Sequence, residues 1–261
     1  MTELSSENSQ IEFLVGNGNE QVIEREILIK REGNSYYGVK VNRVSHEKLV
    51  LSQVWSLNLE SSSIIDFKLS NIHEHTTTTY LTGGKILYKF LDKNLGVVVY
   101  THDRRNLLFS VINSYNGKIL YQASITNVDF TQRINTVFEE NIVLVSYIKK
   151  DKNINRNEVF IVEIMKREIE HSFINLIEKV LQFDSKTENS SNLDETDLIF
   201  QEACYIIPKR VKHIYTSETK LNISNKQIIF VLENNLVYFL DRRFAGGRRP
   251  LAKGKILIKI R

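Results

Sequence analysis

Apolar and polar positions alternate in short blocks along most of the chain, and this pattern predicts β-strands joined by tight turns. In the clearest block, an apolar run at 107–112 meets a polar turn at 113–118, and a second apolar run follows at 119–123. Asn116 and Gly117 in this turn both accept positive φ at little cost. The segment therefore predicts a hairpin of two antiparallel strands.

The same pattern predicts strands over most of the remaining chain. Tyr37, Val39 and Val41 share one face of a half-buried strand at 36–44, and Trp55 lies in its partner strand at 49–59. Turns are predicted at 32–35, 45–48, 139–141 and 234–235. The apolar patch at 11–15 predicts a frayed lead-in or a single strand. Further strands are predicted at 22–29, 64–69, 86–91, 95–100, 134–138, 142–148, 159–165, 205–207, 214–215, 228–233 and 236–240.

One stretch departs from the strand pattern. Apolar side chains at helical spacing predict one short helix near 172–183. The polar, acidic run at 184–197 predicts an exposed insertion loop. The segment at 251–261 is interpreted as a C-terminal tail or a last strand. The helical side chains are Phe173, Leu176, Ile177, Val180 and Leu181.

The recurrence of strand, turn and strand predicts an all-β fold. The unit recurs at 36–59, 95–123, 134–165 and 228–240, at irregular spacing that brackets the blade length of β-propellers. We therefore expect residues 1–250 to form a β-propeller or a partial β-propeller, incomplete at its N-terminal side. A β-sandwich is the alternative. A partial propeller needs a further segment to cover its open sheet edges.

Composition narrows the class of protein without assigning a chemistry. The 261 residues are 42% hydrophobic, and 35 basic against 31 acidic residues leave a net charge of only +4, which predicts no nucleic-acid partner. Residues 1–10 lack the apolar core of a signal peptide, and no 18-residue apolar run occurs, so the sequence alone favours a soluble chain. If the chain belongs to the secretory pathway, we expect it to be part of a longer parent.

Candidate chemistry is sparse. His73 and His75 resemble a metal-binding pair, but two histidines in a polar tract are more typical of a solvated loop. The single cysteine, Cys204, excludes an internal disulfide and a multi-cysteine zinc site, and its apolar surroundings predict a buried, inert thiol. No phosphate-binding glycine pattern occurs. The sequence therefore predicts no catalytic residue, no cofactor and no metal.

The sharpest charge feature is an arginine-rich turn near the end of the chain. Arg242, Arg243, Arg248 and Arg249 flank a Gly-Gly pair. Four guanidinium groups around a flexible turn can bind phosphates, lipid headgroups or an acidic partner surface, and the alternative is a solvated loop with local salt bridges. Asn189 and Asn222 begin glycosylation sequons, which carry little weight alone in an Asn/Ser-rich chain.

Four segments, taken in order, resemble a known family. They are ILYKFLDKNL at 86–95, VINSYNGKIL at 111–120, YIIP at 205–208 and DRRFAGGRRP at 241–250. Together they resemble the C-terminal lumenal region of subunit 1 of the endoplasmic reticulum membrane protein complex. The resemblance covers roughly residues 80–250 and, more weakly, 36–59.

The resemblance implies a function that composition does not. It implies lumenal β-propellers and a non-enzymatic scaffold that helps membrane proteins insert and fold through protein–protein contacts. Its partners would be the other subunits of the complex and membrane-protein clients, on the lumenal side of the endoplasmic reticulum membrane. The chain departs from the family after the Arg-Arg-Pro turn, where lysines interrupt the segment 251–261. Membrane attachment is therefore expected only through parts of a parent outside this chain.

Two rival functions remain open at this level. A cytosolic β-propeller that binds peptides fits the absent signal peptide, and a quinone-dependent propeller enzyme shares the architecture. The enzyme would need clustered cofactor-stacking and metal-binding residues, which the sequence does not offer. Glycosylation at Asn189 or Asn222 would separate a lumenal protein from a cytosolic one.

Overall fold

The structure is a computed structural model, and it describes most of the chain between residues 11 and 245. Within the described ranges the regular structure consists of β-strands, as the sequence pattern predicts. The predicted helix near 172–183, the predicted loop at 184–197 and the tail at 251–261 lie outside these ranges. No helix within them is long and apolar enough to cross a membrane. The described ranges are 11–14, 27–43, 48–59, 62–72, 79–82, 85–150, 155–166, 198–218, 226–242 and 245.

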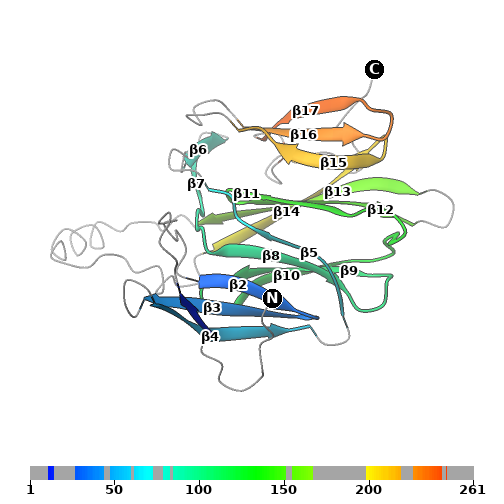
Figure 1. Cartoon of the computed structure of the whole chain (residues 1–261). Coiled ribbons are helices and arrows are strands. Elements are labelled where there is room, and N and C mark those ends of the chain that lie inside the picture. The colour runs from blue at the N-terminus through cyan, green and yellow to red at the C-terminus, as the bar shows by residue number, and fades with distance from the viewer. Residues whose placement is uncertain are drawn as a thin grey trace. The chain divides into compact units, whose positions relative to one another are not determined.

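The strands follow one another through short turns (Figure 1). Their bounds are β1 Ile11–Leu14, β2 Ile27–Glu32, β3 Ser35–Arg43, β4 Lys48–Asn58, β5 Ser63–Leu69, β6 Thr79–Thr82, β7 Lys85–Lys89, β8 Leu95–Thr101, β9 Leu107–Asn113, β10 Ile119–Ile125, β11 Asn135–Glu139, β12 Ile142–Lys149, β13 Arg156–Lys166, β14 Leu198–Ile207, β15 Val211–Thr216, β16 Gln227–Leu232 and β17 Val237–Asp241.

The chain divides into two compact units. The first unit comprises Met1–Phe67 and Asn94–Ile125, and the second comprises Lys68–Lys93 and Thr126–Arg261. Both units interleave along the sequence, so neither is one uninterrupted segment. Each unit has its own buried cluster of hydrophobic side chains.

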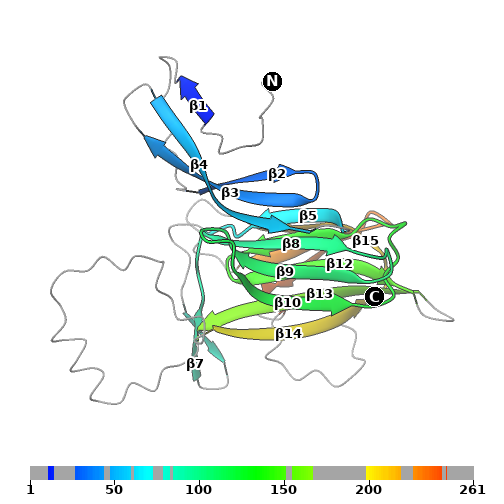
Figure 2. The same cartoon turned by 90° about the horizontal axis from the view of Figure 1, so that it is seen from below.

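The first unit contains two four-stranded sheets, with strand orders β1-β4-β3-β2 and β10-β9-β8-β5. Figure 2 shows β8, β9 and β10 as adjacent ribbons. The sheets are joined by a core of Tyr36 and Trp55 from one sheet and Val98, Tyr100 and Ile112 from the other. Tyr36, and not the predicted pair Tyr37 and Val39, is the side chain of β3 that enters this core.

The predicted hairpin at the centre of the sequence is confirmed, with its turn between Asn113 and Ile119. The strands β9 and β10 pair in antiparallel register. Among the described residues of the turn only Gly117 has positive φ, at 76°, while Asn116 accepts a hydrogen bond from the Lys118 amide through its side chain at 3.0 Å. A side chain at Gly117 would also meet Trp55, whose ring carbon lies 2.7 Å from an ideal Cβ position.

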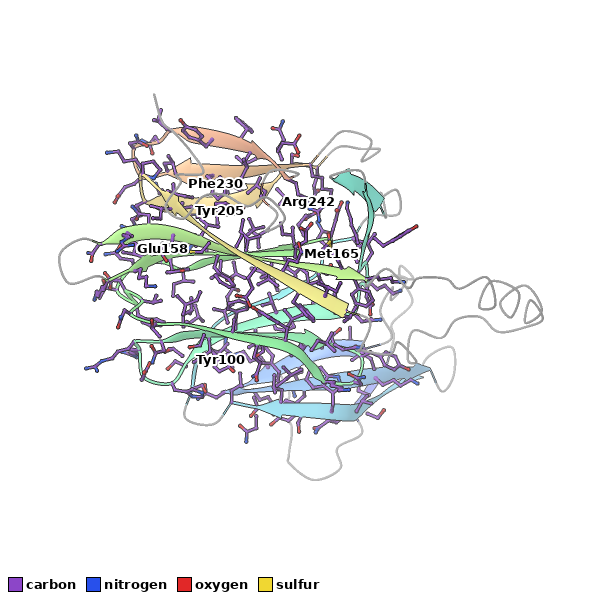
Figure 3. The ribbon with its side chains drawn as sticks, turned by 180° about the vertical axis from the view of Figure 1, so that it is seen from behind. Tyr100, Glu158, Met165, Tyr205, Phe230 and Arg242 are labelled. Carbon is purple, nitrogen blue, oxygen red and sulfur yellow. The ribbon has the colours of Figure 1, made fainter. Side chains whose placement is uncertain are left out.

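The second unit contains two sheets. The larger has the strand order β11-β12-β13-β7-β6, and β14 also pairs with β13, along most of its length. The smaller is the three-stranded sheet β15-β16-β17. Val159 and Ile161 of β13 are fully buried with Tyr205 of β14 and Phe230 of β16. Figure 3 shows Tyr205 and Phe230 near each other between these two sheets. The three-stranded sheet is therefore fixed to the larger sheet by one of its faces.

Several strands differ from the prediction, among them β15, which spans Val211–Thr216 where the sequence predicts only 214–215. The strand β14 begins at Leu198, whereas the sequence predicts only 205–207, and β6 lies in a Thr-rich tract with no predicted strand. The extension of β14 follows from pairing, because it forms ten consecutive register pairs with β13, from Asn157↔Ile207 to Lys166↔Leu198. Such a partner edge is not visible in the local sequence.

Candidate functional site

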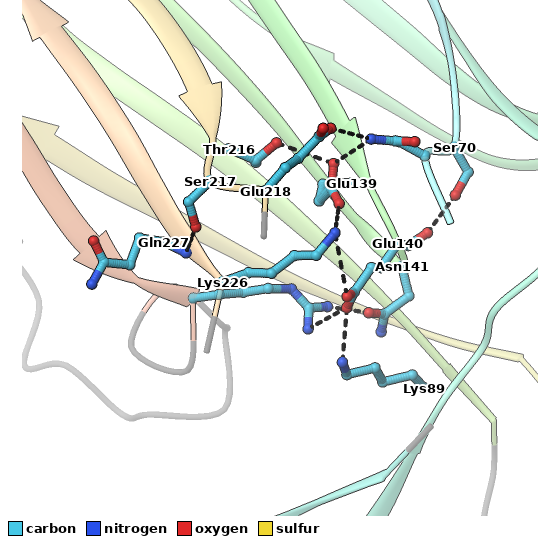
Figure 4. A network of polar contacts seen from close by, with 12 residues as sticks. Ser70, Lys89, Glu139, Glu140, Asn141, Thr216, Ser217, Glu218, Lys226 and Gln227 are labelled. Atoms are coloured by element: carbon cyan, nitrogen blue, oxygen red, sulfur yellow. Dashed lines mark hydrogen bonds and ion pairs between the residues drawn. The ribbon is translucent and has the colours of Figure 1, made fainter. Parts of the chain in front are cut away.

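A network of polar contacts among the described residues of the second unit surrounds the hairpin turn between β11 and β12 (Figure 4). This turn places two adjacent carboxylates, Glu139 and Glu140, in the interior, where their side chains are 2% and 4% exposed. Three cations from distant segments meet them there, namely Lys89, Lys226 and Arg242. We call these five residues the ion-pair cluster.

Glu140 is the centre of the ion-pair cluster. Its Oε2 atom accepts a hydrogen bond from Lys89 Nζ at 2.8 Å and forms an ion pair with Arg242 Nη1 at 2.9 Å. Lys226 Nζ lies 3.7 Å from its other oxygen and also pairs with Glu139. Since charged groups are buried at low cost only when paired, this arrangement explains how three cations remain inside the fold.

The backbone around Glu140 is fixed by neighbouring segments. Glu140 has a φ of 53°, in the left-handed region that costs free energy for a residue with a side chain. Its amide donates to the Asn71 carbonyl at 2.9 Å, and the Ser70 hydroxyl donates to the Glu140 carbonyl at 2.6 Å. Contacts on both sides of the peptide therefore hold the turn in this conformation.

Asn141 and Asn71 connect the ion-pair cluster to the sheet. Asn141 exchanges two hydrogen bonds with Ile164 of β13, its amide side chain donating to the Ile164 carbonyl at 2.6 Å, and its carbonyl accepting from the Ile164 amide at 2.8 Å. Its side-chain oxygen also accepts from Arg242. Asn71 Nδ2 donates to Glu139 at 3.3 Å and to Glu218 at 3.0 Å. The cluster and its neighbours thus tie several segments of the second unit, far apart in the sequence, to one turn.

Burial and charge shift the ionisation of two cluster residues. Burial lowers the pKa of Lys89, and the nearby Arg242 lowers it further, while Glu140 opposes both effects. For Glu140, burial alone would raise the pKa, but the charges of Arg242, Lys89 and Lys226 together hold its pKa below the ordinary value. Glu140 is therefore ionised at neutral pH and engaged by its neighbours.

A second polar group lies on β12, β13 and β14 of the second unit. Tyr147 donates a hydrogen bond to Glu158 at 2.8 Å, and Cys204 Sγ lies 3.6 Å from the same carboxylate oxygen. Desolvation of the Cys204 sulfur beside Tyr147 and Glu158 raises the pKa of the thiol to about 11; the hydrogen bond with Tyr147 opposes this shift, and the Glu158 charge adds to it. Cys204 is exposed, so its predicted burial is wrong. Its raised pKa nevertheless keeps it protonated at neutral pH, which disfavours a nucleophile.

Of the residues predicted from the sequence to contact a partner, the structure describes one. Arg242 is largely buried and pairs with Glu140 and Asn141, so its guanidinium is used inside the fold. Arg243, Arg248 and Arg249 lie outside the described residues, as do Asn189 and Asn222. The candidate metal pair His73 and His75 lies outside them as well. Among the residues that the structure describes, no group of three metal-ligating side chains converges.

One feature of the sequence, the glutamate pair at 139–140, points to the ion-pair cluster. Two adjacent glutamates form the predicted turn at 139–141 between two strongly apolar strands, where such a turn would ordinarily be solvated. The cations lie far from their partners in the sequence: Lys89 is 51 positions from Glu140, Lys226 is 87 positions from Glu139, and Arg242 is 102 positions from Glu140. Local sequence patterns do not extend over such separations. Only the fold brings them together.

Comparison with known proteins gives a consistent family assignment. The family model described as ER membrane protein complex subunit 1, second beta-propeller, matches residues 4–255. Three proteins named ER membrane protein complex subunit 1 are similar to this chain. The one from Schizosaccharomyces pombe is 25% identical over 244 residues, covering 90% of this chain and 26% of the relative.

The other two relatives give the same result. The Xenopus laevis protein is 24% identical over 236 residues, covering 85% of this chain and 21% of the relative. The Saccharomyces cerevisiae protein is 22% identical over 233 residues, covering 85% of this chain and 28% of the relative. The chain thus spans about a quarter of the length of these curated relatives. With the sheets described above, the family match confirms the predicted all-β class, a β-propeller or part of one.

Proposed function

The chain belongs to the family of the second β-propeller of ER membrane protein complex subunit 1, and we propose from this premise that it is a non-enzymatic scaffold region of that complex. In this role it supports the insertion and folding of membrane proteins through protein–protein contacts on the lumenal side of the endoplasmic reticulum membrane. The observation that carries the proposal is the family match over residues 4–255.

The chemistry of the described residues supports a scaffold role. The ionisable groups that the second unit brings together pair with one another, as Glu140 does with Lys89 and Arg242. The exposed thiol of Cys204 has a raised pKa and is not activated. Rigid sheets with variable connecting loops suit protein docking, because loops can vary while the sheets hold them in place.

Affinity purification of the full-length parent tests the proposal. The parent is tagged at its chromosomal locus, solubilised in mild detergent and purified, and the associated proteins are quantified by mass spectrometry. We expect the other subunits of the ER membrane protein complex in amounts comparable to the parent. Recovery of the parent without them would overturn the scaffold role.

Glycan mapping of the same material tests the lumenal location. Peptides that contain Asn189 or Asn222 are compared before and after removal of N-glycans. A glycan at either position requires exposure to the lumen and supports the proposal. Fully unmodified peptides, together with absence of the complex, would favour the cytosolic peptide-binding alternative.

The arginine-rich turn remains our proposal for a partner-contact site, in a revised form. Because Arg242 is paired inside the second unit, the proposed contacts are made by Arg243, Arg248 and Arg249. Reversal of these three charges to Glu is expected to weaken association with neighbouring subunits or anionic lipid while leaving the circular dichroism spectrum unchanged. The matched control reverses Arg104, Arg105 and Lys209, which are exposed and produce the same change in net charge. Equal recovery of partners by both triple variants would remove this turn from the interface.

A further inference from the structure

A small hollow lies in the second unit where β12 ends and where β13 and β15 begin. Arg133, which precedes β11, and Arg210, which precedes β15, both line it. Ser146 and Asn157 line it as well. Two arginines from segments far apart in the sequence therefore border one space that also offers neutral polar groups.

The size of the hollow limits what it can bind. It has room for roughly one water-sized group and opens to solvent. A nucleotide base, a folded cofactor or an aromatic side chain is too large to enter. The tip of a carboxylate side chain fits, and a planar carboxylate matches the fork of a guanidinium group, which donates two parallel hydrogen bonds.

The carboxylates of the fold leave donors of both arginines available. Glu158 also lines the hollow, but its Oε2 atom already accepts a hydrogen bond from Tyr147 at 2.8 Å. Glu233 pairs with Nη1 of Arg210 at 3.2 Å, in a position where the Glu233 side chain is 64% exposed. Arg133 is exposed and forms no ion pair with a residue that the structure describes. An external carboxylate would therefore meet unused guanidinium donors.

Further cations surround this end of the larger sheet. Lys149 and Arg156 are direct cross-strand partners there, and like charges in such a pair destabilise a sheet. Lys212 adds a third, exposed cation next to the hollow residue Val211. The ion-pair cluster lies at the opposite end of β12, where buried carboxylates meet the cations. Positive charge at the hollow end instead attracts an anionic partner.

The position of the hollow disfavours the chain's own acidic run at 184–197 as the occupant. That run joins the sheet at Lys166 and Leu198, the ends of β13 and β14 that are remote from the hollow. Ten register pairs connect these ends with the Asn157↔Ile207 pair, a span of about 30 Å. An acidic segment of another protein is under no such restraint.

We propose that the hollow binds an aspartate or glutamate side chain from an acidic segment of a partner protein, held by the guanidinium groups of Arg133 and Arg210. The surrounding cations steer the segment toward the site, and the two forks orient the carboxylate. This inference goes beyond the scaffold role and does not depend on it, because the assay below reports peptide binding whether or not the complex co-purifies.

Fluorescence anisotropy with the purified full-length parent tests the proposal. The probe is a labelled peptide of alternating Glu, Ser and Gly residues, and the matched peptide carries Gln at every Glu. We expect the parent to bind the acidic peptide at least about tenfold more tightly than the Gln peptide. In Arg133→Gln/Arg210→Gln this preference should disappear. Equal binding of the two peptides by the unaltered parent would overturn the proposal.

Two control variants separate the hollow from net charge. Arg104→Gln/Arg105→Gln removes the same charge from an exposed turn of the first unit and should keep the preference. Arg133→Lys/Arg210→Lys keeps the charge but removes the forks, so it should bind the acidic peptide at least about threefold more weakly. Loss of the preference in the first variant, or unaltered binding in the second, would mean that charge alone attracts the peptide and that the proposal is wrong.

Competition between two small anions of equal charge distinguishes a carboxylate from a lipid phosphate. N-acetylglutamate α-amide carries one carboxylate, and glycerophosphoglycerol is the soluble headgroup of an anionic lipid. We expect the first to displace the acidic peptide at a lower concentration than the second. The reverse order would assign the hollow to a lipid headgroup and overturn the proposal.

Discussion

Within each of the two units, separate segments are held together by a different kind of interaction. In the first unit one large side chain, Trp55, fills the space beside Gly38 and Gly117, and its indole nitrogen donates to the Ser114 carbonyl at 2.8 Å. In the second unit the ion-pair cluster joins distant segments around Glu140. The packing of Trp55 depends on the shape of its surroundings, whereas the ion-pair cluster depends on the pairing of buried charges. Each should therefore be sensitive to substitutions that the other tolerates.

Removal of the central carboxylate should have the largest effect. Glu140→Ala leaves Lys89 and Arg242 buried without their shared partner, so we expect the free energy of unfolding to fall by about 3–5 kcal/mol. Urea denaturation followed by circular dichroism measures this loss. The control is Glu233→Ala, which breaks the exposed pair with Arg210 and should cost about 0–1 kcal/mol. Similar losses for the two variants would show that the cluster is not structural.

Addition of one methyl group should have the next largest effect, in the first unit. An ideal Cβ at Gly38 lies 2.0 Å from Trp55 Nε1, so Gly38→Ala must displace the indole and its hydrogen bond. We expect a loss of about 1–3 kcal/mol and a red shift of the tryptophan emission. Since Trp55 is the one tryptophan of the chain, the emission reports on this site alone.

A matched glycine separates crowding from backbone strain. Gly33 has a φ of 57°, but no heavy atom lies within 4 Å of its ideal Cβ. Gly33→Ala should therefore cost only the left-handed backbone penalty, about 1–2 kcal/mol, without any change in emission. A red shift in Gly33→Ala equal to that in Gly38→Ala would contradict the proposed role of Trp55.

Acid should weaken the second unit before the first. The pKa of Glu140 is lower in the folded chain than its ordinary value of 4.5, so the unfolded chain binds this proton first. Its contribution to stability is complete above about pH 4.5 and disappears as the pH falls through the lower folded pKa. We expect amide exchange at Ile161 and Ile164 to accelerate in that window while Trp55 emission stays constant. In Glu140→Gln this step should be missing.

The smallest predicted effect concerns the second polar group of the second unit. With a pKa of about 11, Cys204 should be alkylated at pH 8 at least about a hundredfold more slowly than an ordinary free cysteine. Its rate should rise with pH up to about 11. A rate at pH 8 close to that of a free thiol would show that neither desolvation nor Glu158 suppresses ionisation of Cys204.

The local pattern of apolar and polar residues predicts most strands, because each of them pairs with a neighbour close in the sequence. The pairs β3–β4, β8–β9, β9–β10, β11–β12 and β16–β17 follow from apolar runs joined by short turns. The start of β14 and the strand β6 did not follow, because neighbouring strands, and not their own residues, specify them. The hairpin at Gly117 was predicted for its backbone freedom, but the contact with Trp55 adds a reason that only the fold reveals.

The sequence predicts the candidate site less well than it predicts the fold. The arginine-rich turn was recognised from its density of charge, yet density does not say which guanidinium enters the interior. Arg242 does so because Glu140, 102 positions earlier, is buried opposite it. The burial of Cys204 was inferred from its apolar neighbours, but alternation along β14 turns the thiol outward while Tyr205 faces the core.

The buried charges of the second unit stabilise its fold, and we propose that the contacts with partners are made elsewhere, on its surface. Quantitative mass spectrometry of the tagged parent carrying Glu140→Gln tests this claim most directly, with complex subunits counted per folded parent molecule. We expect the number of subunits per folded parent molecule to be unchanged, although less folded parent is recovered. A well-folded Glu140→Gln parent that no longer recovers the complex would show that the ion-pair cluster is itself the contact site, contrary to this account.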